Sequence, residues 1–177
     1  KEVEEVLDTA KKLLDEVRRE LERSHEEHKR LSDEIRERLE RSHEETERLL
    51  KEVKEEVDDK NVEEELKKKL DEIRKEDEET LRELEERLKR ADDKNEKIVR
   101  ELEKRLRDVE EELRKLMKDV DIEELKRRID DMVRRLRELV ERDRRESKKV
   151  ADDLRRLVKE NTERAREKIE ELRKDVE

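Results

Sequence analysis

Apolar residues recur along the chain at steps of three and four, the spacing that places them on one face of an α-helix. The repeat is clearest in the middle third of the sequence, where a set of five positions returns twice at a constant interval. The three rounds are Leu66, Leu70, Ile73, Asp77 and Leu81, then Leu84, Leu88, Ala91, Asn95 and Val99, then Leu102, Leu106, Val109, Leu113 and Met117. Five positions in 18 residues average about 3.6 residues each, the period of a helix without supercoil. The pattern therefore predicts long, straight helices.

Two breaks divide this pattern into three helices. The four residues ending at Asn61 interrupt the first apolar face, and Glu64 follows three positions later, the spacing of a capping box. The four residues ending at Asp121 make the second break, with Glu124 in the same relation. We expect helices over about 2–57, 62–118 and 122–177.

Residues 92–95 have the same sequence as the first break at 58–61, Asp-Asp-Lys-Asn. This similarity by itself would predict a further turn. However, Asn95 is followed three positions on by Ile98, so the capping box is missing. The 18-residue period also passes through this stretch without a change of phase. We therefore predict a continuous helix here.

Connections of about four residues force sequential helices to lie antiparallel. The fold expected is all-α: an up-down-up antiparallel three-helix bundle of long straight helices, forming a single domain over 1–177. Facing residues of the first two helices should then have numbers that sum to about 119. The first and third helices should run parallel, with an offset near 119.

Polar residues replace apolar ones at two levels of this arrangement. A short sequence motif with serine and histidine occurs twice in the first helix, one 18-residue repeat apart. Its two copies together contain all three histidines of the chain. The upper level holds Ser24, His25, His28, Asn95, Asp143 and Ser147, and the lower level holds Ser42, His43, Thr46, Asp77, Asn161 and Thr162. The levels should lie about 27 Å apart.

The register predicts particular pairs within these levels. Ser24 should face Asn95, and Ser42 should face Asp77. The third helix should bring Asp143 to Ser24, Ser147 to His28 and Asn161 to Ser42. The sequence leaves open whether His28 bonds to Ser147 or whether His25 or His28 pairs with Asp143. Because buried polar groups need hydrogen-bond partners, we interpret the two levels as polar networks set into an apolar core.

Composition narrows the possible functions. Charged residues make up 64% of the chain, with no glycine, proline, cysteine or aromatic residue, so glycine-rich phosphate loops are excluded. The net charge of −10 argues against a nucleic-acid partner. No apolar run approaches the length of about 20 residues that a membrane-spanning helix needs, so we expect no membrane span. No targeting signal is found, and the localisation stays unknown.

These features resemble de novo designed, parametrically built straight helical bundles with buried hydrogen-bond networks. The resemblance covers the whole chain and is based on the 18-residue repeat, the surface of Glu, Lys and Arg, and the aligned polar levels. It implies a rigid three-helix rod that serves as a structural scaffold with no natural biochemical activity. The chain departs from that pattern in two respects, since its connections lack Gly and Pro and it carries three helices rather than a hairpin.

The histidines raise the question of metal binding or catalysis. Glu22 with His25, and Glu40 with His43, match the Glu-x-x-His element of di-iron bundles, but such sites need these elements on facing helices. Here both lie on one helix, so we expect no metal and no cofactor. Ser, His and Asp meet at the upper level, but a bundle without loops supplies no substrate cleft. We expect no enzyme and no small-molecule substrate.

An alternative is a helical interaction module that self-associates or binds a partner helix, with histidines that make it pH-responsive. Doubled apolar positions would then line an exposed groove. These positions are Leu13 with Leu14, Leu49 with Leu50, Met132 with Val133, and Leu157 with Val158. We favour the interpretation that each helix needs a wider stripe to cover two neighbours, which predicts a monomer.

Overall fold

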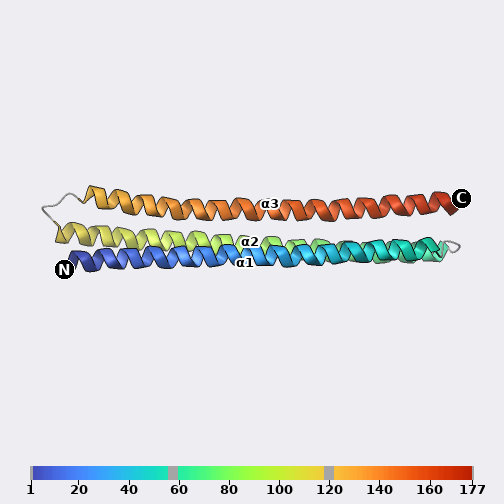
Figure 1. The fold of residues 1–177 in the computed structure, drawn as a ribbon, viewed down its shortest axis with the longest axis horizontal. Helices are drawn as coiled ribbons and strands as arrows, with labels where there is room; N and C mark the ends of the chain where they lie inside the picture. The colour runs from blue at the N-terminus through green and yellow to red at the C-terminus, as the bar shows by residue number, and fades with distance from the viewer. Residues whose placement is uncertain (1, 56–59, 118–121, 177) are drawn as a thin grey trace. The chain divides into compact units, whose positions relative to one another are not determined.

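A computed structural model of the chain describes residues 2–55, 60–117 and 122–176. It contains three α-helices in the order α1 (Glu2–Glu55), α2 (Lys60–Leu116) and α3 (Glu123–Val176), drawn in Figure 1. No strand occurs in the described ranges. The predicted all-α fold of three long helices is confirmed, with every helix end within two residues of the expected one.

The helix starts differ in detail from the predicted caps. α2 begins at Lys60, two residues before the expected start, so Asn61 lies inside the helix and not at its N-cap position. The side chain of Asn61 and all of Asp121 lie outside the described residues. The prediction for residues 92–95 is confirmed, because α2 passes through them without a break.

The contacts of the chain gather into two compact units, and each unit contains a segment of every helix. Unit 1 comprises Lys1–His28 and Leu88–Ser147, and unit 2 comprises Lys29–Arg87 and Lys148–Glu177. The expectation of a single domain over 1–177 stays a prediction.

The core of unit 1 is built from aliphatic side chains of all three helices. Its buried members are Ala10, Leu14 and Leu21 of α1, Val99, Leu102, Leu106, Val109 and Leu113 of α2, and Ile129, Leu136 and Val140 of α3. Each buried leucine contributes roughly 2 kcal/mol relative to an exposed one. Helix direction follows from Glu103 and Glu96, which meet Arg137 and Arg144 in that order, so α2 and α3 run antiparallel.

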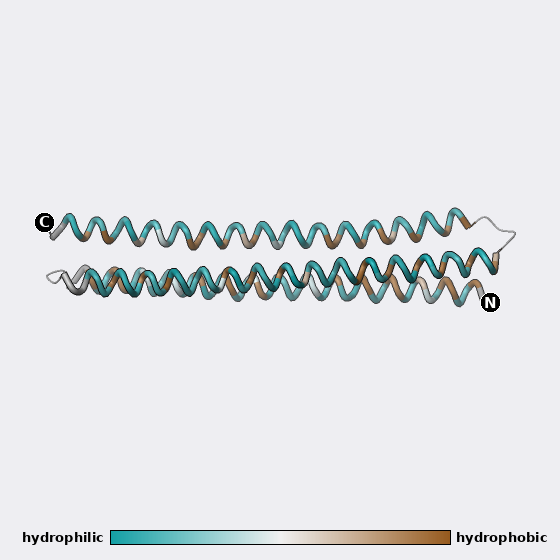
Figure 2. The backbone as a smooth tube through the Cα atoms, turned by 180° about the vertical axis from the view of Figure 1, so that it is seen from behind, coloured by the Kyte–Doolittle hydropathy of each residue, from teal (hydrophilic) through white to brown (hydrophobic). Residues whose placement is uncertain are grey.

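Unit 2 repeats this construction with its own residues. Leu50 of α1, Leu66 of α2, and Ala165 and Ile169 of α3 form one buried cluster. Leu39, Leu84 and Leu154, one from each helix, are among the most completely buried side chains described. Figure 2 shows the source of both cores, since short apolar bands recur along each otherwise hydrophilic helix.

The buried face of α1 differs from the predicted stripe at two places. The apolar steps of three and four run through Leu31 and Leu49, which are half-buried, whereas their neighbours Ser32 and Leu50 are buried. The signal was present in the sequence, because Leu14, Ser32 and Leu50 are spaced by one repeat each. The 18-residue repeat of buried positions in α1 therefore includes Ser32, a polar residue at a position that is leucine in the repeats before and after it.

Candidate functional site

The polar residues that interrupt the apolar faces form two groups in the structure. We call Ser24, His25, His28, Asn95 and Asp143 of unit 1 the His–Asp cluster, and Ser42, Thr46 and Asp77 of unit 2 the Ser–Asp cluster. Each is described within its own unit.

Asp143 of α3 is the centre of the His–Asp cluster. Its Oδ1 lies 2.7 Å from His25 Nδ1 and its Oδ2 lies 2.7 Å from His28 Nδ1. His28 and Asp143 are buried, whereas His25 is half-buried and has Nε2 3.6 Å from Glu146. The two histidines are three residues apart on one helix face, so one carboxylate can accept from both rings. Each Nδ1 must carry a proton to donate in this way.

The surroundings of Asp143 act on its pKa in opposite directions. Burial alone would raise the pKa, but the hydrogen bonds from His28 and His25 prevail and hold it below the ordinary value of 3.8. The carboxylate is therefore ionised near neutral pH. The cluster does not satisfy every polar atom that it buries, because His28 Nε2 has no hydrogen-bond partner among the described residues.

Asn95 connects α2 to the same cluster. Its side chain is 4% exposed, and Nδ2 donates to Ser24 Oγ at 3.0 Å, the pair that the register predicts. Ser147, expected to meet His28, is half-buried, and we find no hydrogen bond from it to other described residues. Of the two partners that the sequence leaves open for His28, the ring bonds to Asp143 and not to Ser147.

The Ser–Asp cluster is smaller. Ser42 Oγ donates to Asp77 Oδ2 at 3.0 Å, again the pair expected from the register. Thr46 is buried and donates to the backbone oxygen of Ser42 on its own helix at 3.0 Å. Asn161 is half-buried and bonds to no other described residue, so the expected contact with Ser42 is not formed. Ser42 has a single hydroxyl hydrogen, which it uses to donate a hydrogen bond to Asp77.

Two further predicted residues lie outside both clusters. Thr162 donates to the backbone oxygen of Val158 at 2.9 Å, a bond within α3. His43 has Nε2 3.8 Å from Glu47, while its buried Nδ1 has no partner in the described ranges. Glu47 also accepts from Lys168 at 2.9 Å, and this bond is the main cause of its lowered pKa. His43 therefore belongs to a charged group between α1 and α3.

Asp77 is a half-buried carboxyl group whose pKa lies well above its ordinary value. Burial is the main cause and raises the pKa from 3.8 to about 6, against the opposing hydrogen bond from Ser42. The nearby carboxylates of Glu76 and Glu45 add to the rise. Asp77 therefore takes up a proton in the folded chain at a pH where it is ionised in the unfolded chain.

This shift predicts how Asp77 affects stability with pH. Between about pH 4 and 6 the folded state binds a proton that the unfolded state does not, so stability falls as pH rises through this window. Asp77→Asn should raise the free energy of unfolding at pH 7.5 by about 1 kcal/mol, allowing for solvent screening of a half-buried carboxylate, and change it little at pH 4. Urea denaturation at both pH values measures this.

The matched control for this experiment is Asp153→Asn, an exposed position on α3. It should leave the pH dependence of stability unchanged. Equal gains for Asp77→Asn at pH 4 and pH 7.5 would contradict the shifted titration of Asp77.

Arginines of α3 bridge to α2 in both units. In unit 1, Arg137 meets Glu103, and Arg144 meets Asp92 at 2.8 Å and also Glu96. In unit 2, Arg155 bonds Glu85 and Arg173 bonds Glu63. The four arginines are exposed and their carboxylate partners are half-buried, so each pair contributes at most about 1 kcal/mol. These pairs show that the contact line between α2 and α3, here called the α2–α3 seam, is bridged by ion pairs in both units.

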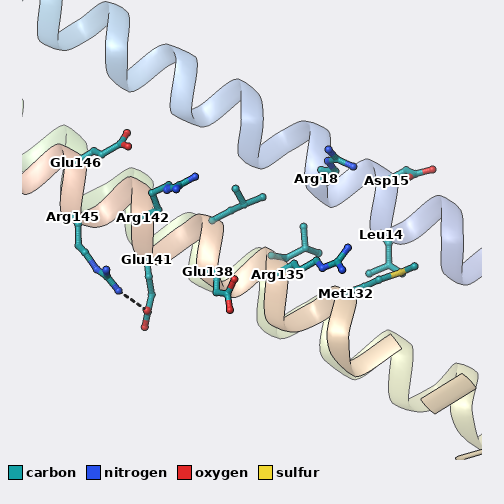
Figure 3. A pocket seen from close by; sticks show the side chains of 12 residues that line it. Leu14, Asp15, Arg18, Met132, Arg135, Glu138, Glu141, Arg142, Arg145 and Glu146 are labelled. Carbon is teal, nitrogen blue, oxygen red and sulfur yellow. Dashed lines mark hydrogen bonds and ion pairs between the residues drawn. The ribbon is translucent and has the colours of Figure 1, made fainter. Parts of the chain in front are cut away.

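The α1–α3 side of unit 1 carries a groove, shown in Figure 3. Met132 is 45% exposed and Leu139 is 37% exposed in it, with Leu14 and Leu136 lining the same groove. The interpretation that doubled apolar positions only cover neighbouring helices is therefore wrong at Met132. The apolar pattern identified Met132 as a position in the stripe of α3. It could not show that the side chain stays partly exposed beside α1.

The described residues offer neither a cluster of metal ligands nor a membrane-spanning helix. No group of three or more His, Cys, Asp or Glu side chains in the described ranges is placed to hold a metal ion. Over no stretch of 18 residues is a described helix apolar enough to cross a membrane. Expectations about metals, cofactors and nucleic acid stay predictions.

Comparison with known proteins gives a likeness to a solved structure. No protein-family model matches the chain, and no curated protein matches it. The chain is similar to a solved structure described as a "Computationally designed three helix bundle". Sequence identity is 26%, the match covers 98% of this chain and 82% of that chain, and the TM-score is 0.40.

Proposed function

We propose that the chain is a designed structural scaffold whose buried polar clusters fix the register of its helices. The 18-residue repeat, the absence of glycine and aromatic residues, and a surface of Glu, Lys and Arg support this origin. One observation carries the role of the clusters. The hydrogen bonds between α1 and α2, Ser24 with Asn95 and Ser42 with Asp77, join residues whose numbers have the same sum, 119.

An apolar face alone defines the register poorly. Hydrophobic burial is not directional, and a helix with an 18-residue repeat presents a similar face after sliding by one repeat. A polar group that slides against a leucine is buried without a partner, at a cost of about 1–3 kcal/mol. Paired polar residues therefore penalise the shifted arrangements more than they stabilise the native one.

Two clusters restrict the register more than one. A slip of one repeat between α1 and α2 would bring Ser42 opposite Asn95, so one pair would still form. The same slip would place Ser24 opposite Leu113 and separate Asp77 from its serine. Only the native register satisfies both pairs.

A catalytic role for the His–Asp cluster is not proposed, because its serine is not activated. Ser24 Oγ accepts a hydrogen bond from Asn95 and meets neither histidine. A nucleophilic serine needs a histidine within hydrogen-bond distance to take its proton.

The register is tested by distance measurements between spin labels. The sequence has no cysteine, so Arg36→Cys and Glu83→Cys, at exposed facing positions of α1 and α2 in unit 2, provide two unique attachment sites. The labelled protein should give one narrow distance. Adding Ser42→Ala and Asp77→Leu should broaden or split that distribution while keeping or raising the melting temperature.

The labelled protein with its clusters intact is the control, and helicity by circular dichroism shows that both proteins are folded. An unchanged narrow distance after removal of the Ser–Asp cluster would mean that apolar packing sets the register in unit 2.

A further inference from the structure

The groove on the α1–α3 side of unit 1 is unusual in leaving apolar side chains in solvent. Met132 and Leu139 are seven positions apart, about two helical turns, and so lie on the same face of α3. They are two of the three large hydrophobic side chains that are exposed in the described residues. Leu14 and Leu136 extend the apolar lining of the groove. The face is long enough to receive another helix.

Several charges beside this face lack partners in the described part of the chain. Arg135, Glu138 and Arg142 line the groove and form no ion pair with other described residues. Figure 3 shows an ion pair among the lining side chains, Arg145 with Glu141. The α2–α3 seam of the same unit is bridged by arginines. On the groove side Glu146 lies near His25 of α1, whereas these three charges have no ion-pair partner among the described residues.

Charges along this face form an alternating row. Asp131, Arg135, Glu138 and Arg142 follow one another at steps of four, three and four along α3, with signs minus, plus, minus, plus. All four are exposed, and Asp131 accepts one hydrogen bond from Arg134 on its own helix. Such a row is complementary to itself when it is turned end for end.

We infer that a second copy of this chain docks in the groove, with the two α3 helices antiparallel across a two-fold axis. Residues whose numbers sum to 273 then face one another. Arg135 meets the partner's Glu138, and Asp131 meets the partner's Arg142, and the two-fold axis forms each pair twice. A parallel copy would instead place Arg135 beside the partner's Arg135.

The same alignment covers the exposed apolar residues. Met132 and the partner's Leu139 have numbers that sum to 271, so they lie within two residues of level, about 3 Å along the helix axis. That offset is within the reach of both side chains. The paired charges and the apolar residues Met132 and Leu139 lie on the surface, outside the buried clusters.

Light scattering coupled to size exclusion tests this dimer over a range of concentrations. The mass should rise from one chain, 22.0 kDa, at low micromolar concentration toward twice that value at several hundred micromolar. The double change Met132→Glu and Leu139→Glu should abolish the rise. Added salt at about 0.5 M should weaken dimerisation, because exposed ion pairs are screened.

Charge reversal gives the sharper test, because the predicted pairing is reciprocal. Arg135→Glu alone and Glu138→Arg alone should each weaken dimerisation by about tenfold or more, since like charges then meet. The double variant with both changes should recover it. An equimolar mixture of the two single variants should form a heterodimer, because each supplies the charge that the other lacks.

Arg156→Glu is the matched control for Arg135→Glu. Arg156 is an exposed arginine of α3 outside the groove, and its substitution changes the net charge by the same amount. It should leave dimerisation unchanged. A mass of one chain at every concentration, a trimer mass, or a double variant that stays monomeric would each overturn the antiparallel dimer. Circular dichroism of each variant separates these outcomes from loss of folding.

Discussion

Replacing Asp143 with leucine is expected to lower the free energy of unfolding by about 3 kcal/mol. The carboxylate accepts hydrogen bonds from both His25 and His28, and its removal leaves the buried ring of His28 with no hydrogen-bond partner among the described residues. Stranding one member of a buried polar pair costs more than the pair itself contributes. Urea denaturation at pH 7 gives the difference.

The double variant Asp143→Leu and His28→Leu separates this cause from a simple packing defect. Removing both partners should recover most of the lost stability, because no buried polar group is then stranded by the change. Asp153→Leu, at an exposed position of the same helix, is the control for introducing a leucine. A single variant as stable as the parent would show that His28 does not depend on Asp143.

Leu84→Ala should have an effect of similar size, about 3 kcal/mol, for a different reason. Leu84 is 0% exposed, so its whole side chain is enclosed by the protein. Truncation removes apolar contact and leaves a cavity that a bundle of long helices cannot easily close. Thermal or urea unfolding measures the loss.

Met132→Ala is the matched comparison for Leu84→Ala. Met132 is 45% exposed, so its truncation should change stability by no more than about 0.5 kcal/mol. Similar losses for the two variants would contradict the assignment of Leu84 to the core. Low protein concentration keeps self-association out of the measurement.

Periodicity was enough to predict the three helices and much of the register. Steps of three and four determine which side of a helix is buried, and the break at 58–61 sets how two helices align. The hydrogen bonds of Ser24 with Asn95 and Ser42 with Asp77 follow from that alignment alone. This works because an antiparallel hairpin with a short connection has little freedom to slide.

Hydrogen-bond partners within a level were beyond the reach of the sequence. Asp143 was expected near Ser24 but accepts from His25 and His28, because a carboxylate has two oxygens and can serve donors from successive positions. Ser147 and Asn161 do not form the predicted bonds with other described residues. Numbering gives the height of a residue along a helix, whereas partner choice depends on side-chain rotamers.

An exposed groove at Met132 was the alternative that the sequence did not favour, for a related reason. A stripe of apolar residues shows how wide the buried face of a helix can be, but not how closely the neighbouring helix approaches it. The charges of Arg135 and Glu138 were equally visible in the sequence. Only the structure shows that these two charges form no ion pair with other described residues, whereas the arginines of the α2–α3 seam in the same unit do.

The distribution of the three histidines has a practical consequence for spectroscopy. His25 and His28 belong to unit 1 and both present Nδ1 to one carboxylate, whereas His43 belongs to unit 2 and lies beside Glu47. Their imidazole nuclei therefore give the two units separate NMR reporters without any labelling mutation. Following these few resonances through a urea titration would reveal whether the units melt together or one after the other.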